Sequence, residues 1–548
     1  MLSPDGRTLY VCNRFNNDVS VLDLARRKEL RRVAVQREPV TAALTKDGRF
    51  LLVANHLSTG RTDVDDVSAV VSVIDTAAGK VVKELRLPSG SESLQDIRVS
   101  PDGRYAALTH ILATFDRATT QVAAGWINAN ALTIIDLARM ELRYTLLLDH
   151  PDKGAANPWG LAWSADNRKL VVTHAGTREV SVIDFPRLLE SLPERPGASV
   201  AGNPPSRALI YLNEIDRNLT FIGSARERVK LPQGDLGPRA VVIAGQTAYV
   251  ANYFSDTLSV IDLSQNDAAR AFQPAGSGDF SAFAARRRPV PSILKHGTGM
   301  SREPADRNVC ATLSKPGIES IPLRPKREMD IVREGEFYFH DAGICFQGWQ
   351  SCASCHPGNG RVDGLNWDLR NDGVSNPKNT KSLLLTDQTP PAMSLGVRSN
   401  AEVAVRAGIK FILFTTQSEE VPASIDEYLK SLKPVPSPYL EKGELSKEAK
   451  RGRKVFVRAG CATCHPPDLF TDLRPYDVGT RHVFDKPTDK FDTPTLIELW
   501  RTAPYLHDGS AATVRDVLTT RNPRDEHGKT SGLSNREIDD LCAFLLSL

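Results

Sequence analysis

Short runs of apolar and β-branched residues alternate with polar turns through the first half of the chain. One unit places an apolar run at 9–12 after the turn Ser3-Pro4-Asp5-Gly6, and a second run follows at 19–23. The second run, typified by Val-Ser-Val-Ile-Asp, returns at 71–75, 132–136, 180–184 and 258–262. Two such runs with Asp-Gly or similar turn chemistry predict an antiparallel hairpin.

The repetition of this hairpin predicts the architecture of the first half. A hairpin cannot bury both of its faces alone, so repeats of this length stack radially into a β-propeller. We therefore expect an all-β propeller over residues 1–275, nominally with seven blades. The five units recognised here fall a blade or two short of that number, and the sequence opens inside a repeat. We expect the N-terminal end of the propeller to be incomplete.

The pattern changes after the propeller. Residues 276–323 follow neither a two-residue nor a 3.6-residue period and predict an irregular linker. Beyond it, Ser424, Ser446 and Ser534 stand where they would cap helices, and apolar residues with helical spacing follow them. We expect two mainly α-helical domains of the cytochrome c type: 324–440 and 441–548.

Composition narrows the class of protein. The 548 residues include 69 Lys and Arg against 66 Asp and Glu, so the formal charge is only +3. That balance leaves no basic excess to neutralise nucleic-acid phosphates. No apolar stretch approaches the roughly 20 residues of a membrane-spanning helix. The sequence predicts a multidomain protein with no nucleic-acid partner and no membrane span.

Two five-residue motifs carry the chemistry. They are Cys352-Ala353-Ser354-Cys355-His356 and Cys461-Ala462-Thr463-Cys464-His465. The spacing CxxCH is typical of c-type haem attachment, in which the two sulfurs bind the haem vinyl groups. The histidine that follows becomes the proximal iron ligand. We predict two covalently bound haems, with His356 and His465 as iron ligands.

Other chemistries also use CxxC pairs. One is a zinc ion bound by four thiolates, and the other is a pair of redox disulfides. Zinc ribbons place their CxxC pairs about 15–20 residues apart, far closer than the two pairs here. Neither alternative requires histidine after both second cysteines. The sequence also leaves open whether Cys310 and Cys345 pair with each other.

Longer segments resemble known families. Asn13, Asn55 and the Val-Ser-Val-Ile-Asp strands resemble the YVTN-repeat propellers. Residues 334–341, 491–496 and 502–510 resemble bacterial di-haem cytochrome c peroxidases and their relatives that oxidise amine-dehydrogenase precursors. This resemblance implies that electrons enter at the haem of His465 and pass to the haem of His356. There they would reduce H₂O₂, or the flow would reverse to oxidise a partner protein.

The resemblance also implies a second ligand for the relay haem. Many family members supply a methionine after the Tyr-x-His-Asp-Gly stretch, but this chain has none after Met393. We predict that His527 takes this role, with His507 as the second choice, while a plain loop position is the alternative for His527. Two imidazoles give a lower reduction potential than histidine plus methionine.

The reactive haem departs further from the family. Its usual Asn-Pro-x-Glu-Met stretch is missing, and Glu419 and Glu420 occupy about the same place. They are the candidate acids for peroxide cleavage, although two adjacent loop glutamates are also typical of a solvated face. Met393 lies near the position of the family's inter-haem tryptophan and would close the iron if it ligates. With both irons closed, the chain would be an electron-transfer protein that docks through its propeller.

The family places Ca²⁺ between its haem domains. By position, the ligands here would be the Asn379 side chain and the main-chain carbonyls of Thr502 and Pro504, a set of oxygens that suits a hard cation. Asn379 is equally typical of a turn. We further expect a small cytochrome or cupredoxin as redox partner, and a propeller that binds a protein. Haem attachment of this type implies a periplasmic or extracellular location, with a signal peptide that the given sequence does not contain.

Overall fold

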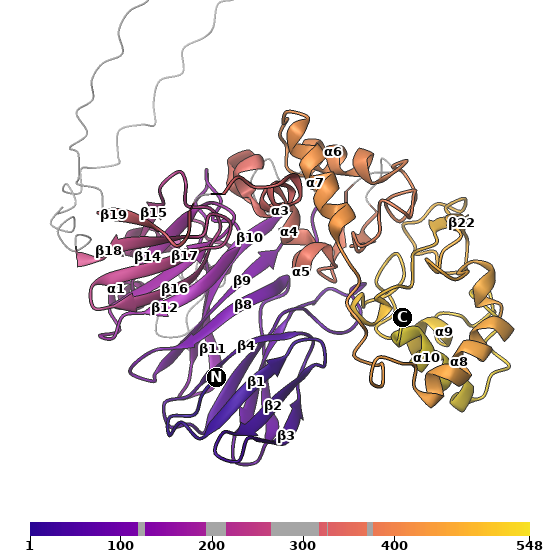
Figure 1. Ribbon diagram of the computed structural model, residues 1–548, viewed down its shortest axis with the longest axis horizontal. Helices are drawn as coiled ribbons and strands as arrows, with labels where there is room; N and C mark the ends of the chain where they lie inside the picture. The colour runs from indigo at the N-terminus through magenta and orange to yellow at the C-terminus, as the bar shows by residue number, and fades with distance from the viewer. Residues whose placement is uncertain (119–126, 193–214, 265–316, 326, 370–375) are drawn as a thin grey trace, which may run out of the picture.

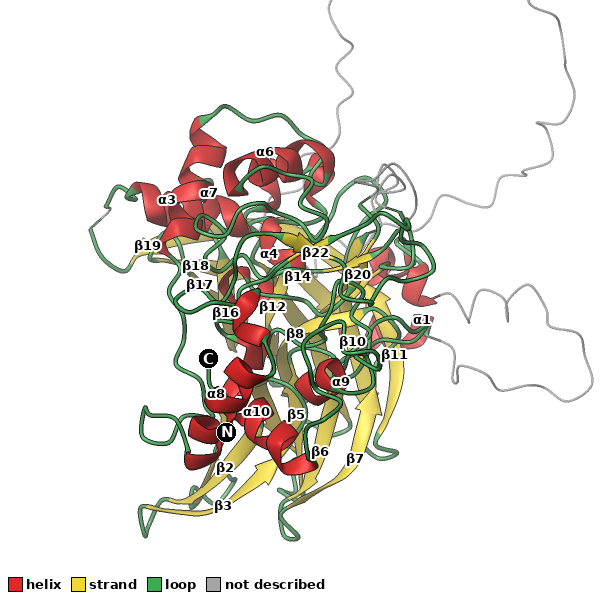
Figure 2. Cartoon of the chain, turned by 90° about the vertical axis from the view of Figure 1, so that its right-hand side faces the viewer, coloured by secondary structure: helices red, strands yellow, loops and turns green. Residues whose placement is uncertain are grey.

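The structure, a computed structural model, describes residues 1–118, 127–192, 215–264, 317–325, 327–369 and 376–548. Strands make up the first part of the chain, and two groups of helices lie along one side of them (Figure 1). Figure 2 shows the helices α8, α9 and α10 in front of the strands. The chain therefore has the predicted multidomain architecture of a propeller followed by a helical cytochrome c region.

Among the residues that the structure describes, five antiparallel sheets form the blades of the propeller. Within each sheet the strands follow chain order, and β4 lies beside β8, β8 beside β12 and β12 beside β16. The blades are β1 (Thr8–Asn13), β2 (Asp18–Asp23), β3 (Lys28–Ala34); β4 (Pro39–Leu44), β5 (Phe50–Asn55), β6 (Val70–Asp75), β7 (Lys80–Arg86); β8 (Ser91–Val99), β9 (Tyr105–Ala113), β10 (Asn128–Asp136), β11 (Glu141–Leu147); β12 (Pro158–Trp163), β13 (Lys169–His174), β14 (Glu179–Asp184), β15 (Arg226–Lys230); and β16 (Pro238–Ala244), β17 (Thr247–Asn252), β18 (Thr257–Asp262), β19 (Ile318–Pro322).

A repeated hydrogen bond explains part of the sequence repeat. The amide of Asn55 at the end of β5 donates to the hydroxyl of Ser72 in β6 at 2.9 Å, and both side chains are buried. The same bond joins Asn13 to Ser20 and Asn252 to Ser259 in two other blades. Buried polar groups need such partners, so the asparagine and the serine recur together.

The fifth blade differs from the sequence prediction. Its outer strand β19 pairs antiparallel with β18, with Ile318 opposite Ile261 and Pro322 opposite Thr257. Residues 318–322 fall inside the segment predicted as an irregular linker, and that segment up to residue 316 lies outside the described residues. A strand that returns to the edge of a sheet satisfies backbone groups that the blade would otherwise expose.

The helical region contains two groups of helices, and its division into cytochrome domains at 324–440 and 441–548 stays a prediction. None of the described helices is long and apolar enough to cross a membrane. The helices are α1 (Phe185–Ser191) in the propeller, then α3 (Ile331–His340), α4 (Cys352–Cys355), α5 (Pro357–Gly360), α6 (Ala401–Phe411) and α7 (Glu420–Ser431), then α8 (Lys447–Arg458), α9 (Val514–Leu518) and α10 (Asn535–Leu546). Two short ribbons, β20 (Asn366–Trp367) with β21 (Lys378–Asn379) and β22 (Pro475–Tyr476) with β23 (Phe491–Asp492), complete this region.

The same helix crossing organises both groups. An added Cβ at Gly335 of α3 would lie 1.9 Å from the carbonyl oxygen of Ser424 in α7, and one at Gly452 of α8 would lie 1.8 Å from that of Asp540 in α10. Only glycine permits so close an approach of two backbones. An aromatic pair packs across each crossing, with ring centroids 5.3 Å apart in both: Phe339 with Tyr428, and Phe456 with Phe544.

The predicted helix starts hold at two of three positions. Ser446 caps α8 and Ser534 caps α10, each accepting a hydrogen bond from a backbone N–H of the first turn. The prediction at Ser424 is wrong, because α7 already begins at Glu420. Pro422 fits within the first turn of a helix, where backbone N–H groups have no partner to lose. The Ser424 hydroxyl instead donates to the carbonyl of Val421.

Candidate haem sites

The two CxxCH motifs lie in different helical domains. The first spans α4 and packs in a core that includes Cys352, whereas the second begins at the short 3₁₀ turn Cys461–Thr463 and packs in a separate core that includes Cys461. All four motif sulfurs are free thiols. A zinc site of four thiolates would need both pairs together, which this arrangement does not provide.

A hydrogen bond orients each motif histidine. Nδ1 of His356 donates to the carbonyl of Arg361 at 3.2 Å, and Nδ1 of His465 donates to the carbonyl of Phe470 at 2.8 Å. Because a carbonyl only accepts, the proton is on Nδ1 and the lone pair is on Nε2. Burial lowers the pKa of both rings, to about 4 for His356. Two thiols and an oriented neutral imidazole fit c-type haem in both domains.

His527 faces His465 in the second domain. Their ring centroids are 6.5 Å apart and their planes differ by 37°. Two metal–nitrogen bonds of about 2 Å, together with the distance from each ring centre to its nitrogen, give about 6 Å for imidazoles on opposite sides of one metal. Asn522 bonds both the backbone N–H and the carbonyl of His527. The spacing of the two rings would allow His465 and His527 to hold one haem iron together.

His507 lies elsewhere in the same domain. Its Nε2 is 2.8 Å from the carboxylate of Asp485, and its ring stacks on Phe491 with centroids 3.6 Å apart. Although burial opposes it, hydrogen bonds led by that of His507 hold the pKa of Asp485 far below its usual range. In the structure, the side chain of His507 therefore bonds to Asp485, whereas the ring of His527 lies next to that of His465.

A loop of similar sequence and backbone conformation occurs in both helical domains, and in the first domain it contains Met393. The loops at 389–396 and 502–509 share Thr-x-Pro and a final Gly, and the backbone is left-handed at Met393 (φ 74°) and at Leu506 (φ 73°). Met393 therefore corresponds to Leu506, whereas His527 belongs to the later segment between α9 and α10. The matching segment of the first domain, 412–418 between α6 and α7, contains no histidine or methionine. The two haem sites are unequal at this position.

Glu419 and Glu420 lie at the solvent-facing start of α7. Glu419 is 71% exposed and accepts a hydrogen bond from Nε of Arg406 at 2.9 Å. A general acid requires a desolvated carboxyl whose pKa is raised. Glu419 thus forms an ion pair at the surface, and Glu420 beside it is also exposed in the part of the chain that the structure describes. Neither carboxyl has the desolvated setting expected of a general acid, and their catalytic role stays a prediction.

The predicted calcium ligands lie where both helical domains meet the propeller. The backbone N–H of Asn379 donates to the carbonyl of His507 at 2.7 Å, which ties Asn379 to the loop of Thr502 and Pro504. The carbonyl of Ala503, between those two residues, accepts from the guanidinium of Arg37 at 2.5 Å. A cationic side chain of the propeller thus already binds this loop, and calcium stays a prediction.

Asparagines of the propeller hold the first haem motif. Asn128 of β10 donates to Sγ of Cys355 at 3.3 Å. Asn157, just before β12, donates to the hydroxyl of Ser351 and accepts from that of Ser354, both at 2.8 Å. All of these polar groups are buried except the sulfur, which is half-buried. The propeller therefore contacts the first CxxCH motif directly, whereas His527 and His465 face each other within the second domain.

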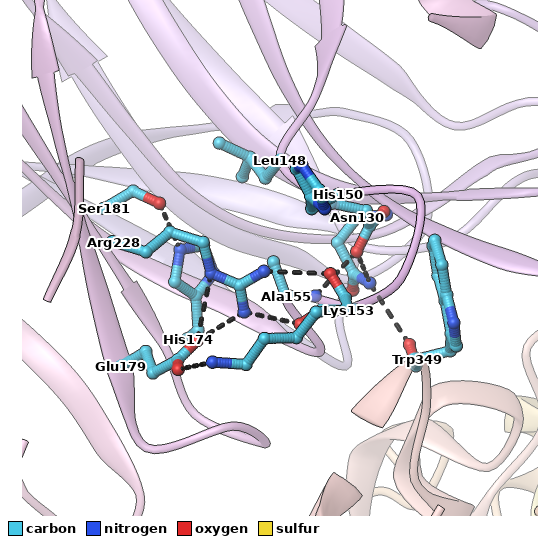
Figure 3. A network of polar contacts seen from close by, with 12 residues as sticks. Asn130, Leu148, His150, Lys153, Ala155, His174, Glu179, Ser181, Arg228 and Trp349 are labelled. Atoms are coloured by element: carbon cyan, nitrogen blue, oxygen red, sulfur yellow. Dashed lines mark hydrogen bonds and ion pairs between the residues drawn. The ribbon is translucent and has the colours of Figure 1, made fainter. Parts of the chain in front are cut away.

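Figure 3 shows the polar network behind these asparagines. Asn130 donates to the carbonyl of Trp349 at 3.2 Å, and the carboxylate of Asp149 accepts from both nitrogens of Asn130 and from the N–H of Ala155. Burial raises the pKa of Asp149 to about 6. The network fixes the strand that carries Asn128 and Asn130 against the chain that leads into the first motif.

One arginine joins the first motif to the second domain. The Arg361 side chain makes two hydrogen bonds to Glu498, at 2.8 and 2.9 Å, while its carbonyl orients His356. Both side chains are at most 5% exposed. Glu498 also accepts from the N–H of Val435 at 2.5 Å. Contacts that hold the proximal histidine thus continue into the neighbouring domain.

Sequence reasoning missed the asparagines and this ion pair. A signal exists only for β10, where Asn128 and Asn130 alternate at the start of a strand that is otherwise mostly apolar. Asn157, Arg361 and Glu498 look like ordinary loop residues in the sequence. The Asn157 contacts to Ser351 and Ser354 and the Arg361–Glu498 pair each join positions more than a hundred residues apart, so no local pattern reveals them.

Asn157→Ala is expected to destabilise the first cytochrome domain by about 1–3 kcal/mol, because the buried hydroxyl of Ser354 loses its acceptor and that of Ser351 loses its side-chain donor. The Soret band of the first haem should shift, and that of the second should not. Chemical denaturation and visible spectra of the holoprotein measure both effects. Asn252→Ala removes an equally buried asparagine that bonds only within its own blade, and it should leave both haem spectra unchanged.

Family models match both parts of the chain. A cytochrome c model matches residues 449–548, which contain the second haem motif. A model of the seven-bladed lactonase β-propeller matches residues 1–65, which contain the first blade and part of the second. Both matches agree with the fold of the region they cover.

Curated relatives match about half of the chain each. Hydrazine synthase subunit gamma of Kuenenia stuttgartiensis is 31% identical over 321 residues, which cover 48% of this chain and 90% of that relative. Subunit beta of the same enzyme is 27% identical over 45% of this chain and 59% of the relative. Methylamine utilization protein MauG of Methylorubrum extorquens is 27% identical over 43% of this chain and 81% of the relative. On the extent of the first match, the chain belongs to the protein family of the hydrazine synthase subunit gamma.

Proposed function

We propose that the chain is a di-haem c-type oxidoreductase of the cytochrome c peroxidase kind. Electrons pass from the haem of His465 to that of His356 and reduce H₂O₂, or flow in reverse to oxidise a partner protein. When bound, haem supplies one-electron redox chemistry at each iron. The inequality of the two sites carries this proposal. His527 faces His465, while the matching segment 412–418 offers the first site no histidine or methionine.

In this proposal the second site relays electrons and the first site reacts with the substrate. The imidazoles of His465 and His527 leave no free position for a substrate, which suits an electron relay. At the first site, His356 donates to the carbonyl of Arg361, and Asn128 of the propeller donates to the sulfur of Cys355. A small cytochrome or cupredoxin is the proposed electron donor, and the periplasm or cell exterior is the proposed location.

The test begins with the mass of the holoprotein, which should exceed that of the polypeptide by two haems. Cys464→Ser should weaken attachment at the second site, whereas Cys12→Ser, which changes a thiol of the first blade, should leave the haem content unchanged. The reduced protein is then mixed with H₂O₂ in a stopped-flow spectrometer. Rapid oxidation of both haems supports the proposal. Bleaching, or no reaction, contradicts the peroxidase activity.

A second candidate is a non-catalytic electron carrier that docks through its propeller. The position of Glu419 favours it, because an exposed carboxylate paired with Arg406 is poorly suited to act as a general acid. Electron paramagnetic resonance of the oxidised protein separates the two candidates. A high-spin ferric signal supports the enzyme, and two low-spin signals support the carrier.

The relatives suggest a further substrate class. Two of them are subunits of one enzyme named for hydrazine synthesis, so we infer that small nitrogen compounds are alternative substrates of the first site. Hydroxylamine and nitric oxide are the probes. Oxidation of the reduced protein by either, without reaction with H₂O₂, would favour this class over peroxide.

A further inference from the structure

A fully buried carboxyl of the propeller lacks a complete set of partners. Glu92 in β8 is 0% exposed, and its Oε2 accepts from the Ser93 hydroxyl at 2.7 Å. Its Oε1 has no hydrogen-bond partner among the described residues. A β-bulge begins here, since the pairing of β8 with β9 shifts after Glu92 and Ser93 has a left-handed backbone. Bulges of this kind re-aim side chains next to functional sites.

The strand register places Glu92 on the face of the blade that meets the first haem motif. Glu92 lies opposite Ile111 of β9, and Ile111 lies opposite Asn130 of β10. Residues opposite each other share a face of the sheet, so Glu92 and Asn130 are on one face, two strand spacings or about 10 Å apart. Asn130 and Asn128 reach the motif from that same face.

A second buried carboxyl approaches from the first cytochrome domain. Asp363 is 0% exposed and accepts from the N–H of Leu365 at 2.9 Å and from the indole of Trp367 at 2.7 Å. Trp367 and Leu365 pack in one apolar cluster with Cys355 and residues of the propeller. Asp363 is thus enclosed beside the apolar cluster that contains the attachment cysteine Cys355.

Burial raises the pKa values of both Glu92 and Asp363. Burial, and then the neighbouring Asp363, raise the pKa of Glu92 far above its usual range, while burial raises the pKa of Asp363 to about 6. The cation that acts on Asp363 is Arg37 of the propeller.

We propose that Glu92 and Asp363 form a redox-linked proton site for the first haem. The pair takes up one proton from solvent when the iron gains one electron from the redox partner, and it releases that proton when the iron loses the electron. Two carboxyls that are close together in a dry site do not both ionise readily, and one more negative charge nearby favours their protonated form. Electron and proton together leave the buried charge unchanged. This inference rests on the proposed haem attachment at Cys352 and Cys355.

Spectroelectrochemical titration of the holoprotein at a series of pH values from 5 to 8 tests the proposal. The reduction potential of the first haem should fall as the pH rises, approaching one proton per electron. Asp363→Asn removes the group that titrates in this range and should cut that slope by at least half. Glu92→Gln removes the neighbouring carboxyl and should move the slope to lower pH. The second haem should respond to neither variant.

Controls keep the outcome clear. Glu84→Gln changes a propeller carboxyl that accepts from Ser72 and should leave the slope unchanged. If Glu92→Gln fails to fold, Ser93→Ala removes a hydrogen bond that favours the Glu92 carboxylate and should move the slope to higher pH. A first-haem potential that is independent of pH in the unchanged protein overturns the proposal, as does a slope that both variants preserve. Loss of haem attachment would appear in the mass, and failure of peroxide reduction would not alter the potentials.

Discussion

Glu498→Gln is expected to lower the free energy of unfolding of the holoprotein by about 3–5 kcal/mol, because it leaves the Arg361 guanidinium buried without its charged partner. Arg361 is 5% exposed and Glu498 1%, so solvent does not replace the lost bonds. The carbonyl of Arg361 also orients His356, so the Soret band of the first haem should change as well. Denaturant titration followed by fluorescence and by the Soret band measures both effects.

Glu427→Gln is the matched control for this variant. Glu427 pairs with Lys430 at 2.9 Å, but both side chains are about two-fifths exposed. Exposed pairs contribute about 0–1 kcal/mol, so this change should leave the unfolding midpoint and the haem spectrum nearly unaltered. If Glu427→Gln and Glu498→Gln lowered the free energy of unfolding equally, the buried pair would contribute no more to stability than the exposed one.

His527→Met should raise the reduction potential of the second haem by on the order of 0.1–0.3 V, since axial ligands move haem potentials over about 0.8 V and methionine favours the reduced iron. Burial and then the nearby His465 lower the pKa of His527 to about 4, so the unchanged ring is neutral and able to bind metal at pH 7. Redox titration followed in the visible spectrum, with near-infrared bands for methionine ligation, measures the change.

A control in the same domain is His482→Gln, which alters a histidine beside Phe484 and should leave both potentials unchanged. His527→Ala should give the second haem a high-spin ferric signal by opening the iron. If the potential and spin state of the second haem are the same in all three variants, His527 is not its ligand.

The propeller could be predicted because its determinants are local. Each repeated run forms a strand, and the bond between Asn55 and Ser72 lies within one blade. The outer strand β19 could not be predicted, since residues 318–322 gain their structure only by pairing with a strand more than fifty positions earlier. Ser424 shows the same limit within a helix. Its capping pattern is genuine, but Glu420 begins the helix one turn earlier.

The two CxxCH motifs could also be identified from the sequence, because the pattern consists of only five consecutive residues. His527 could be named from what the sequence lacks, a methionine, and the structure brings it to face His465. Glu419 and Glu420 were chosen by position alone, and position does not say which side of α7 faces solvent. Asn128, Asn157 and Glu92 come from the propeller, and only the packing of one domain on another reveals their contacts.

The cover that Asn128 and Asn157 place over the first motif bears on the order of biogenesis. Thioether formation requires the enzymes of cytochrome maturation to reach Cys352 and Cys355 together with the porphyrin. When the propeller docks, Asn157 engages the hydroxyls of Ser351 and Ser354 beside these cysteines and would restrict access to them. If haem is attached here, the expected order is therefore attachment of the first porphyrin before the propeller packs on this segment.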